Sequence, residues 1–192
     1  MTTDTTEVLG GPAGPGENDG AGAGRGAAAG ASAPEPADGR HGPRMNLFER
    51  APGVYRAMVA LDRAAKEGLD PVLAELVKIR ASQLNHCAYC LDMHTKDARA
   101  AGEREDRIHL LSAWEEATGY YTEKERAALA LTEAVTVLTD GFVPDEVYRR
   151  AAAHFDEAEL ARLISVIVTI NSWNRIAVTT RSVPGHYQPP GT

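Results

Sequence analysis

The chain of 192 residues contains two cysteines, which are separated by two residues in the segment Cys87-Ala-Tyr-Cys90. A pair at this spacing cannot build a framework of structural disulfides, and it is typical of a redox-active dithiol or of a metal site. Two unreactive thiols are the third alternative. In a helix, Cys90 lies three residues after Cys87 and His94 four residues after Cys90, so all three side chains share one face.

The residues before the pair predict how the thiols are activated. Asn85 is a good N-cap, and it predicts a helix from His86 to Ala101 that ends at Gly102. Both sulfur atoms then lie in the first helical turn, where free backbone N–H groups and the helix dipole stabilise a thiolate and lower the pKa of a thiol below its usual value of about 8.5. His94, one turn further along, is placed to take up or relay the proton.

A carboxylate in the preceding helix completes the candidate site. Glu75 lies among apolar residues of that helix, and a carboxylate in such surroundings is unfavourable unless it has a partner. The imidazole of His94 is the partner that would create an arrangement of nucleophile, base and orienting group. The alternative is a structural ion pair of Glu75 with Lys78 or Arg80.

The same four residues could instead bind zinc. Cys87, Cys90, His94 and Glu75 supply the thiolate, imidazole and carboxylate ligands that zinc prefers. Three of them fall within eight residues of one helix, which is a tight geometry for a tetrahedral site. The residues alone therefore favour redox chemistry and leave metal binding open.

The elements that must position these residues are helices. Alanine is abundant, aromatic residues make up 6% of the chain, and apolar residues recur at steps of three and four. The signals for helix starts are Asp70-Pro71, Thr122-x-x-Glu125, Pro144 and Asp156-x-x-Glu159. We therefore predict an all-α fold, a single domain of about six to seven helices. The expected helical ranges are 45–61, 72–84, 86–101, 103–117, 126–138, 144–154 and 156–180.

The last predicted helix is apolar on nearly every side. Its β-branched residues between Ile164 and Ile170 would suit a strand by propensity. The run does not alternate with polar residues, and a capping box precedes it, so a helix is the better interpretation. We expect this helix to be buried at the centre of the domain or shared with another subunit.

Both ends of the chain differ from the middle. Residues 1–44 hold 11 of the 18 glycines and hardly a large apolar side chain, which predicts a disordered low-complexity tail. Residues 45–181 form the expected helical domain, and residues 182–192 the expected C-terminal tail. The net charge of −7 disfavours nucleic-acid binding. We find neither an apolar run of about 20 residues nor a signal peptide, and so expect a cytoplasmic protein that does not span a membrane.

Together these residues resemble the alkylhydroperoxidase D and carboxymuconolactone decarboxylase superfamily. The pattern Glu75-x11-Cys87-x2-Cys90-x3-His94 matches the signature of its peroxidases. The resemblance continues through the segments 92–103 and 172–178 and through Trp114, and it covers Met45 to Arg181. A bare Cys-x-x-Cys is a weak signal, whereas four residues at these spacings are a specific one.

The resemblance implies an antioxidant oxidoreductase, a peroxidase of the alkylhydroperoxidase D kind. Cys90 would be the thiolate that attacks a hydroperoxide and becomes a sulfenic acid, and Cys87 the proton donor and resolving thiol. Glu75 and His94 would be the proton relay. The resemblance implies no haem, flavin or metal cofactor. It implies an external dithiol reductant, lipoyl- or thioredoxin-like, and a homotrimer or a multiple of it.

One position departs from the pattern of close peroxidase relatives. These carry a histidine just before the second cysteine, where this chain has Tyr89, so we expect a different proton relay at that point. Decarboxylase members typically lack the cysteine pair, so its presence here disfavours an acid–base decarboxylase, which stays the second alternative. A zinc-stabilised or redox-sensing interaction protein is the third.

Overall fold

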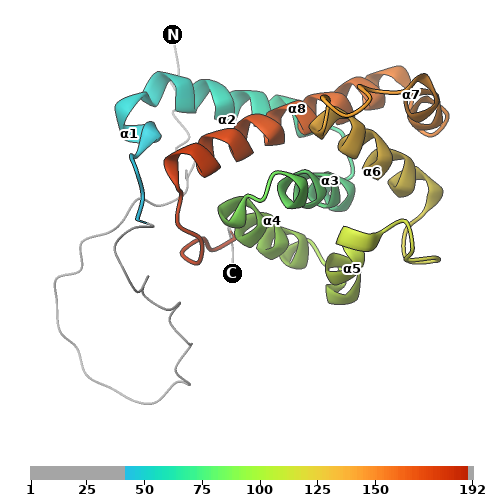
Figure 1. Ribbon diagram of the computed structural model, residues 1–192, viewed down its shortest axis with the longest axis horizontal. Coiled ribbons are helices and arrows are strands. Elements are labelled where there is room, and N and C mark those ends of the chain that lie inside the picture. Colours follow the sequence, from blue (N-terminus) through green and yellow to red (C-terminus); the bar gives the residue numbers. More distant parts are fainter. Residues whose placement is uncertain (1–41, 190–192) are drawn as a thin grey trace, which may run out of the picture. The chain divides into compact units, whose positions relative to one another are not determined.

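The computed structural model describes residues 42–189, and within this range it contains helices and no strand, which confirms the predicted all-α fold. Eight α-helices and one short 3-10 helix follow one another along the described part of the chain (Figure 1). They are α1 (Leu47–Arg50), α2 (Pro52–Lys66), α3 (Pro71–Leu84), α4 (Ala88–Ala100), α5 (Glu105–Leu110), η1 (Leu111–Ala113), α6 (Glu123–Thr136), α7 (Asp145–Ala152) and α8 (Glu157–Thr180).

Most of the predicted helix starts are confirmed. The Asp70 side chain accepts the backbone N–H of Leu73 at 2.8 Å and caps α3. Capping boxes of Thr122 with Glu125 and of Asp156 with Glu159 open α6 and α8. These caps satisfy backbone N–H groups that have no partner in the first turn of a helix, and so they set the helix ends locally.

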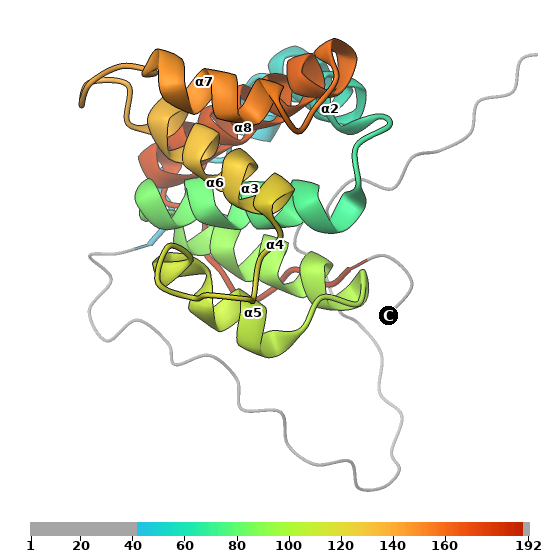
Figure 2. The same ribbon diagram turned by 90° about the vertical axis from the view of Figure 1, so that its right-hand side faces the viewer.

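Helix α3 lies at the centre of the described domain. It packs against α4, α6 and α8, and Figure 2 shows it between α8 on one side and α4 on the other. One apolar cluster joins α3 to α2, α6, α7 and α8, and a second joins it to α4, α5 and α6. Because α3 takes part in both clusters, the side chains that it carries are held from several directions.

Helix α8 is also central, as its composition predicts. It contacts α2, α3, α4, α6 and α7. Two of its apolar side chains, Val168 and Val178, are nevertheless about half exposed, at 48% and 47%. Within the described residues, no helix combines the length and the apolar character needed to cross a membrane.

The prediction of one helix over residues 103–117 is wrong. Helix α5 ends at Leu110 and the chain tightens into η1. Beyond η1, the buried Trp114 donates its indole N–H to Glu133 of α6 at 2.6 Å, and Arg126 of α6 binds the Trp114 carbonyl oxygen at 2.9 Å. These contacts with α6 hold the segment in a turn that its local sequence does not indicate.

Most of the predicted N-terminal tail, residues 1–41, lies outside the described residues. Arg44 lies against the end of α8, since its backbone N–H donates to the Thr180 carbonyl at 2.8 Å. At the other end, residues 182–189 contain no helix and lie along α4. The backbone N–H of Gly185, for example, donates to Asp92 at 2.9 Å.

Candidate active site

The connection between α3 and α4 differs from the prediction. Asn85 is the C-cap of α3 rather than the N-cap of the next helix. His86 follows with a positive φ of 52°, and the backbone N–H of Cys87 then donates to the Ser82 carbonyl at 3.0 Å. Helix α4 therefore begins at Ala88 with Cys87 as its N-cap. Both cysteines still lie at the start of the helix, as the sequence predicts.

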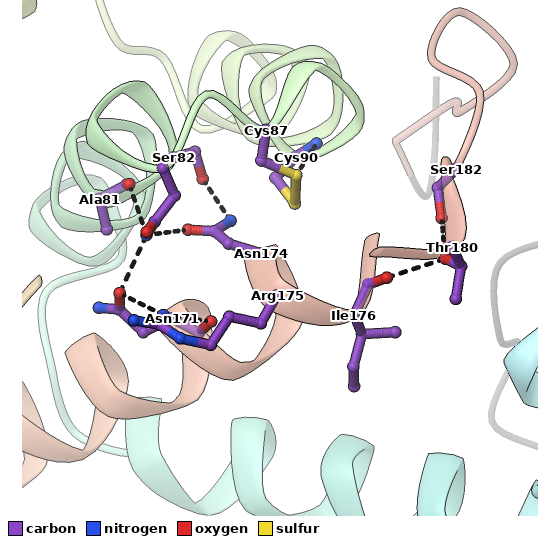
Figure 3. The surroundings of a disulfide bond; sticks show 11 residues. Ala81, Ser82, Cys87, Cys90, Asn171, Asn174, Arg175, Ile176, Thr180 and Ser182 are labelled. Atoms are coloured by element: carbon purple, nitrogen blue, oxygen red, sulfur yellow. Dashed lines mark hydrogen bonds between the residues drawn. A yellow bond between two sulfur atoms is a disulfide. The ribbon is translucent and has the colours of Figure 1, made fainter. Parts of the chain in front are cut away.

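The side chain of Asn85 is hydrogen-bonded to α8 and does not cap α4. Its side-chain amide donates to Asn171 and to Asn174 at 2.9 Å each, and to the Ala81 carbonyl at 3.0 Å. Asn174, which is completely buried, donates in turn to the Ser82 hydroxyl at 3.0 Å. We call Ser82, Asn85, Asn171 and Asn174 the amide cluster. It joins the end of α3, directly before the cysteines, to the middle of α8 (Figure 3).

Cys87 and Cys90 are joined in a disulfide, with Cα atoms 5.4 Å apart (Figure 3). Each cysteine is 1% exposed, and the pair packs against Ala177 of α8 and the half-buried Tyr89. The Cys90 backbone N–H points at the Cys87 sulfur at 3.4 Å. This N–H belongs to the first turn of the helix, and it favours negative charge on the Cys87 sulfur after reduction.

One turn further along α4, His94 meets Glu75 of α3. The His94 Nδ1 atom lies 2.8 Å from the Glu75 Oε2 atom, which is the pairing that the sequence predicts. The other Glu75 oxygen accepts from Lys78 at 3.0 Å, so the predicted alternative partner is present as well. Arg80 binds Glu133 of α6 instead. Glu75 is thus held by two partners at once.

The partners of Glu75 decide its charge. Burial alone would raise the pKa of Glu75, but the hydrogen bond and charge of His94, together with those of Lys78, lower that pKa to about 2. Burial would likewise lower the pKa of Lys78, but the charge and hydrogen bond of Glu75, together with the charges of Asp62 and Asp97, raise that pKa. A charged carboxylate on Nδ1 favours the proton on that nitrogen, which leaves Nε2 free to accept one.

A second carboxylate lies near the same ring. The Asp97 Oδ2 atom is 4.0 Å from the His94 Nδ1 atom, and the Asp97 Oδ1 atom accepts the hydroxyl of Tyr187 at 2.6 Å. Burial raises the pKa of Asp97, and the nearby Glu75 charge adds to this, whereas the Tyr187 hydrogen bond lowers it. We call Glu75, Lys78, His94, Asp97 and Tyr187 the charged cluster.

A cavity of about 340 Å³ opens beside the charged cluster. Glu75 and Asp97 line it together with Lys66 of α2 and the apolar residues Leu69, Pro71, Ala74 and Ala101. Donor atoms of Glu75, His94 and Asp97 lie within 4.8 Å of one another, which is close enough to hold a cation. The buried Lys78 ammonium already lies 3.0 Å from Glu75, and it supplies the compensating positive charge from the protein itself.

Comparisons with known proteins identify the family of this chain. Residues 52–134 match the carboxymuconolactone decarboxylase family. The uncharacterized protein YdfG of Bacillus subtilis is 43% identical over 136 residues, which are 70% of this chain and 92% of that protein. The chain belongs to the alkylhydroperoxidase D and carboxymuconolactone decarboxylase superfamily.

Solved structures show the same fold. A protein of unknown function from Agrobacterium tumefaciens, ATU0492, which its name links to the antioxidant defence protein AhpD, is 39% identical with a TM-score of 0.73. The alignment covers 75% of this chain and 99% of that one. The debrominase Bmp8, at 17% identity and a TM-score of 0.65, shares the fold over 72% of this chain and 74% of its own.

Within this superfamily fold, the four predicted site residues form two directly bonded pairs. Cys87 forms a disulfide with Cys90, and Glu75 forms a hydrogen bond with His94. Sequence reasoning missed Asp97, Tyr187 and the amide cluster. Two asparagines three residues apart in the apolar α8 were a visible signal for the amide cluster, because a buried amide needs partners. Nothing in the local sequence around Tyr187 indicates its contact with Asp97.

Proposed function

We propose that this chain is a thiol-dependent peroxidase that reduces alkyl hydroperoxides through a sulfenic acid and disulfide cycle. The observation that carries the proposal is the buried Cys87–Cys90 pair at the start of α4, one turn before an imidazole that is bound to a charged carboxylate. Superfamily members include enzymes, and membership is compatible with a peroxidase-related role.

In the first step the Cys90 thiolate attacks the distal oxygen of the hydroperoxide, and the O–O bond breaks. Cys90 becomes a sulfenic acid, and the alkoxide takes up a proton and leaves as an alcohol. Cys90 is the better candidate nucleophile because it lies one helical turn from His94. His94, with Glu75 on its Nδ1 atom, accepts the thiol proton and returns it to the leaving oxygen.

In the second step the Cys87 thiol attacks the sulfur of the sulfenic acid, and water leaves. This yields a disulfide between the two cysteines, the form that the structure contains. An external dithiol, lipoyl- or thioredoxin-like, then supplies two electrons and two protons to reopen it. A cycle of this kind belongs in a reducing compartment such as the cytoplasm.

The proposed assembly is a homotrimer or a multiple of it. Exposed apolar side chains on α2 and α8 support association, because such faces are usually covered. They are Val54, Val59 and Leu61 on α2 and Val168 and Val178 on α8, each at least 41% exposed. Light scattering at micromolar concentration should report three subunits or a multiple, and a monomer would contradict the assembly.

The decisive experiment is peroxide consumption by the reduced protein with several dithiol donors, run beside Cys90→Ser and Cys87→Ser. We expect Cys90→Ser to consume no peroxide and to give no signal with a sulfenic-acid trapping reagent. Cys87→Ser should form the sulfenic acid and stop after about one equivalent, since no neighbouring thiol closes the disulfide. Trapping on Cys87 instead would reverse the two roles and keep the reaction.

Three other outcomes would replace the proposal. Release of carbon dioxide from a carboxylated lactone by the double serine variant would favour acid–base decarboxylation by His94 and Glu75. Stoichiometric zinc that protects both thiols from alkylation would favour a metal site. Debromination of 2,3,4-tribromopyrrole without peroxide turnover would favour the chemistry of Bmp8.

A further inference from the structure

The C-terminal segment reaches the charged cluster from outside the helical domain. Tyr187 donates its hydroxyl to Asp97 at 2.6 Å, and its backbone carbonyl accepts from Lys96 at 3.0 Å. Gly185 is bound to Asp92 in addition. Three contacts along one face of α4 thus dock a segment without helix or strand, and one of them ends on a carboxylate beside His94.

Asp97 faces His94 from the same helix. Its Oδ2 atom is 4.0 Å from Nδ1, too far for a hydrogen bond but close enough for an electrostatic interaction in a partly buried site. Glu75 is directly bonded to the same nitrogen. Two carboxylates at Nδ1 both favour a ring that carries its proton there and can accept a second proton on Nε2.

The hydrogen bond from Tyr187 orients the carboxylate of Asp97. A hydroxyl that donates to one carboxylate oxygen favours the ionised form and restricts rotation of the carboxylate group. The other oxygen is then the one that faces His94. Without this hydrogen bond Asp97 could rotate into the adjacent cavity, which it lines.

We propose that Asp97 and Tyr187 are positioning residues of the active site, which act through His94 to hold its proton on Nδ1 and so favour the Cys90 thiolate. This inference deepens the proposed function, because it adds two residues to the same thiol site. It assigns a role in the reaction to a segment outside the helices.

Other charged groups lie on the helices around this cluster, and the substitutions at Asp97 and Tyr187 leave them in place. They are Glu75 and Lys78 from α3, Asp62 and Lys66 from α2, and Asp92 and Lys96 from α4. Asp97→Asn and Tyr187→Phe remove one charge and one hydroxyl, respectively, with little change in shape.

The experiment measures the pH dependence of iodoacetamide alkylation of Cys90 in reduced full-length protein, with Cys87→Ser as the common background. We expect Asp97→Asn to move the midpoint of the profile upward by about 0.5 to 1 pH unit. The substitution removes a carboxylate that favours positive charge on the His94 ring, and that charge would favour the Cys90 thiolate. Tyr187→Phe should move it in the same direction by less. In the same samples, the ¹⁵N shifts of the neutral His94 ring should show less proton on Nδ1.

A double substitution and a control separate positioning from docking. Since Tyr187 acts through Asp97, adding Tyr187→Phe to Asp97→Asn should give no further shift. Lys96→Met loosens the same segment without touching Asp97 and should leave the ring tautomer of His94 unchanged. Unchanged profiles and tautomers in Asp97→Asn and Tyr187→Phe would overturn the proposal. Additive shifts, or a Lys96→Met tautomer change equal to that of Tyr187→Phe, would also overturn it.

These outcomes are separable from those of the peroxidase assay. If the reduced wild-type chain turns over no peroxide with any donor, the proposed function fails, while the alkylation profile and the ring tautomer still test Asp97 and Tyr187. If peroxide turnover is robust and neither readout moves, the inference fails alone.

Discussion

Two groups of polar side chains flank the start of α4, and they stabilise the site by different means. The amide cluster joins the end of α3 to α8 through neutral groups, and its central residue, Asn174, is 0% exposed. The charged cluster lies one to two turns further along α4 and contains two carboxylates, an ammonium and an imidazole. The first cluster can fix the backbone at the cysteines, and only the second can exchange protons.

This difference separates geometry from reactivity. Neutral hydrogen bonds have the same strength at every pH at which the protein works, so the loop that carries Cys87 keeps its conformation while the site titrates. The charged cluster changes its interactions with every proton that it gains or loses. A thiol enzyme needs both properties, and in this fold they are supplied by α8 and by α3, respectively.

The largest stability effect should come from Glu75→Gln. The folded-state pKa of Glu75 is about 2, below its ordinary value of 4.5, so its stabilisation is complete above pH 4.5 and is lost as the pH falls towards 2. At pH 7 the substitution should cost about 3 kcal/mol, because it leaves Lys78 buried with a weaker partner. Urea unfolding at several pH values measures this difference.

The matched control for this effect is an exposed ion pair. Glu105 binds Arg99 at the surface, and Glu105→Gln should change the unfolding free energy little at any pH. A loss that is the same at pH 7 and at pH 2 would contradict the assignment of Glu75 to a pH-dependent cluster.

Asn174→Ala tests the contribution of the amide cluster to stability. It removes the partner of the Ser82 hydroxyl and one acceptor of Asn85, and leaving buried polar groups unpaired should cost about 2 kcal/mol. The loss should be the same from pH 5 to pH 9. Ser172→Ala in the same helix, where the exposed hydroxyl binds the Val168 carbonyl four residues earlier, should change stability by less than about 0.5 kcal/mol.

His94→Ala measures how strongly the charged cluster affects the ionisation of the Cys90 thiol. If the imidazole stabilises the thiolate directly, the pH midpoint of Cys90 alkylation should rise by about one unit, or ~1.4 kcal/mol. His86→Asn is the control, since it removes an exposed imidazole beside Cys87 and keeps a residue that tolerates the positive φ. Equal shifts in both variants would show that His94 has no special role.

The smallest effect should follow from deletion of the N-terminal tail up to Pro43. The shortened chain keeps Arg44, whose backbone N–H binds Thr180. The deleted residues contain few large apolar side chains, so stability and activity should change by less than about 1 kcal/mol. A larger loss in thermal unfolding would reveal a contact between the tail and the domain.

The sequence alone determined the fold class, most helix ends and the four residues proposed for catalysis. These depend on local rules. A capping box lies within four residues, an apolar face repeats every three or four, and the spacing of Cys87, Cys90 and His94 places them on one side of a helix. Glu75 could be added because a carboxylate among apolar neighbours in a helix needs a partner.

Only the tertiary structure decided which distant residues form hydrogen bonds with each other at the site. The local sequence predicts Asn85 as a helix N-cap. In the structure its side chain instead donates to acceptors on α8, 86 and 89 residues away, and Cys87 is the N-cap of α4. Tyr187 lies in a segment without periodicity, and it meets Asp97 across 90 residues. Such contacts depend on the packing of whole helices, and a local pattern carries no information about which distant group will compete for a donor.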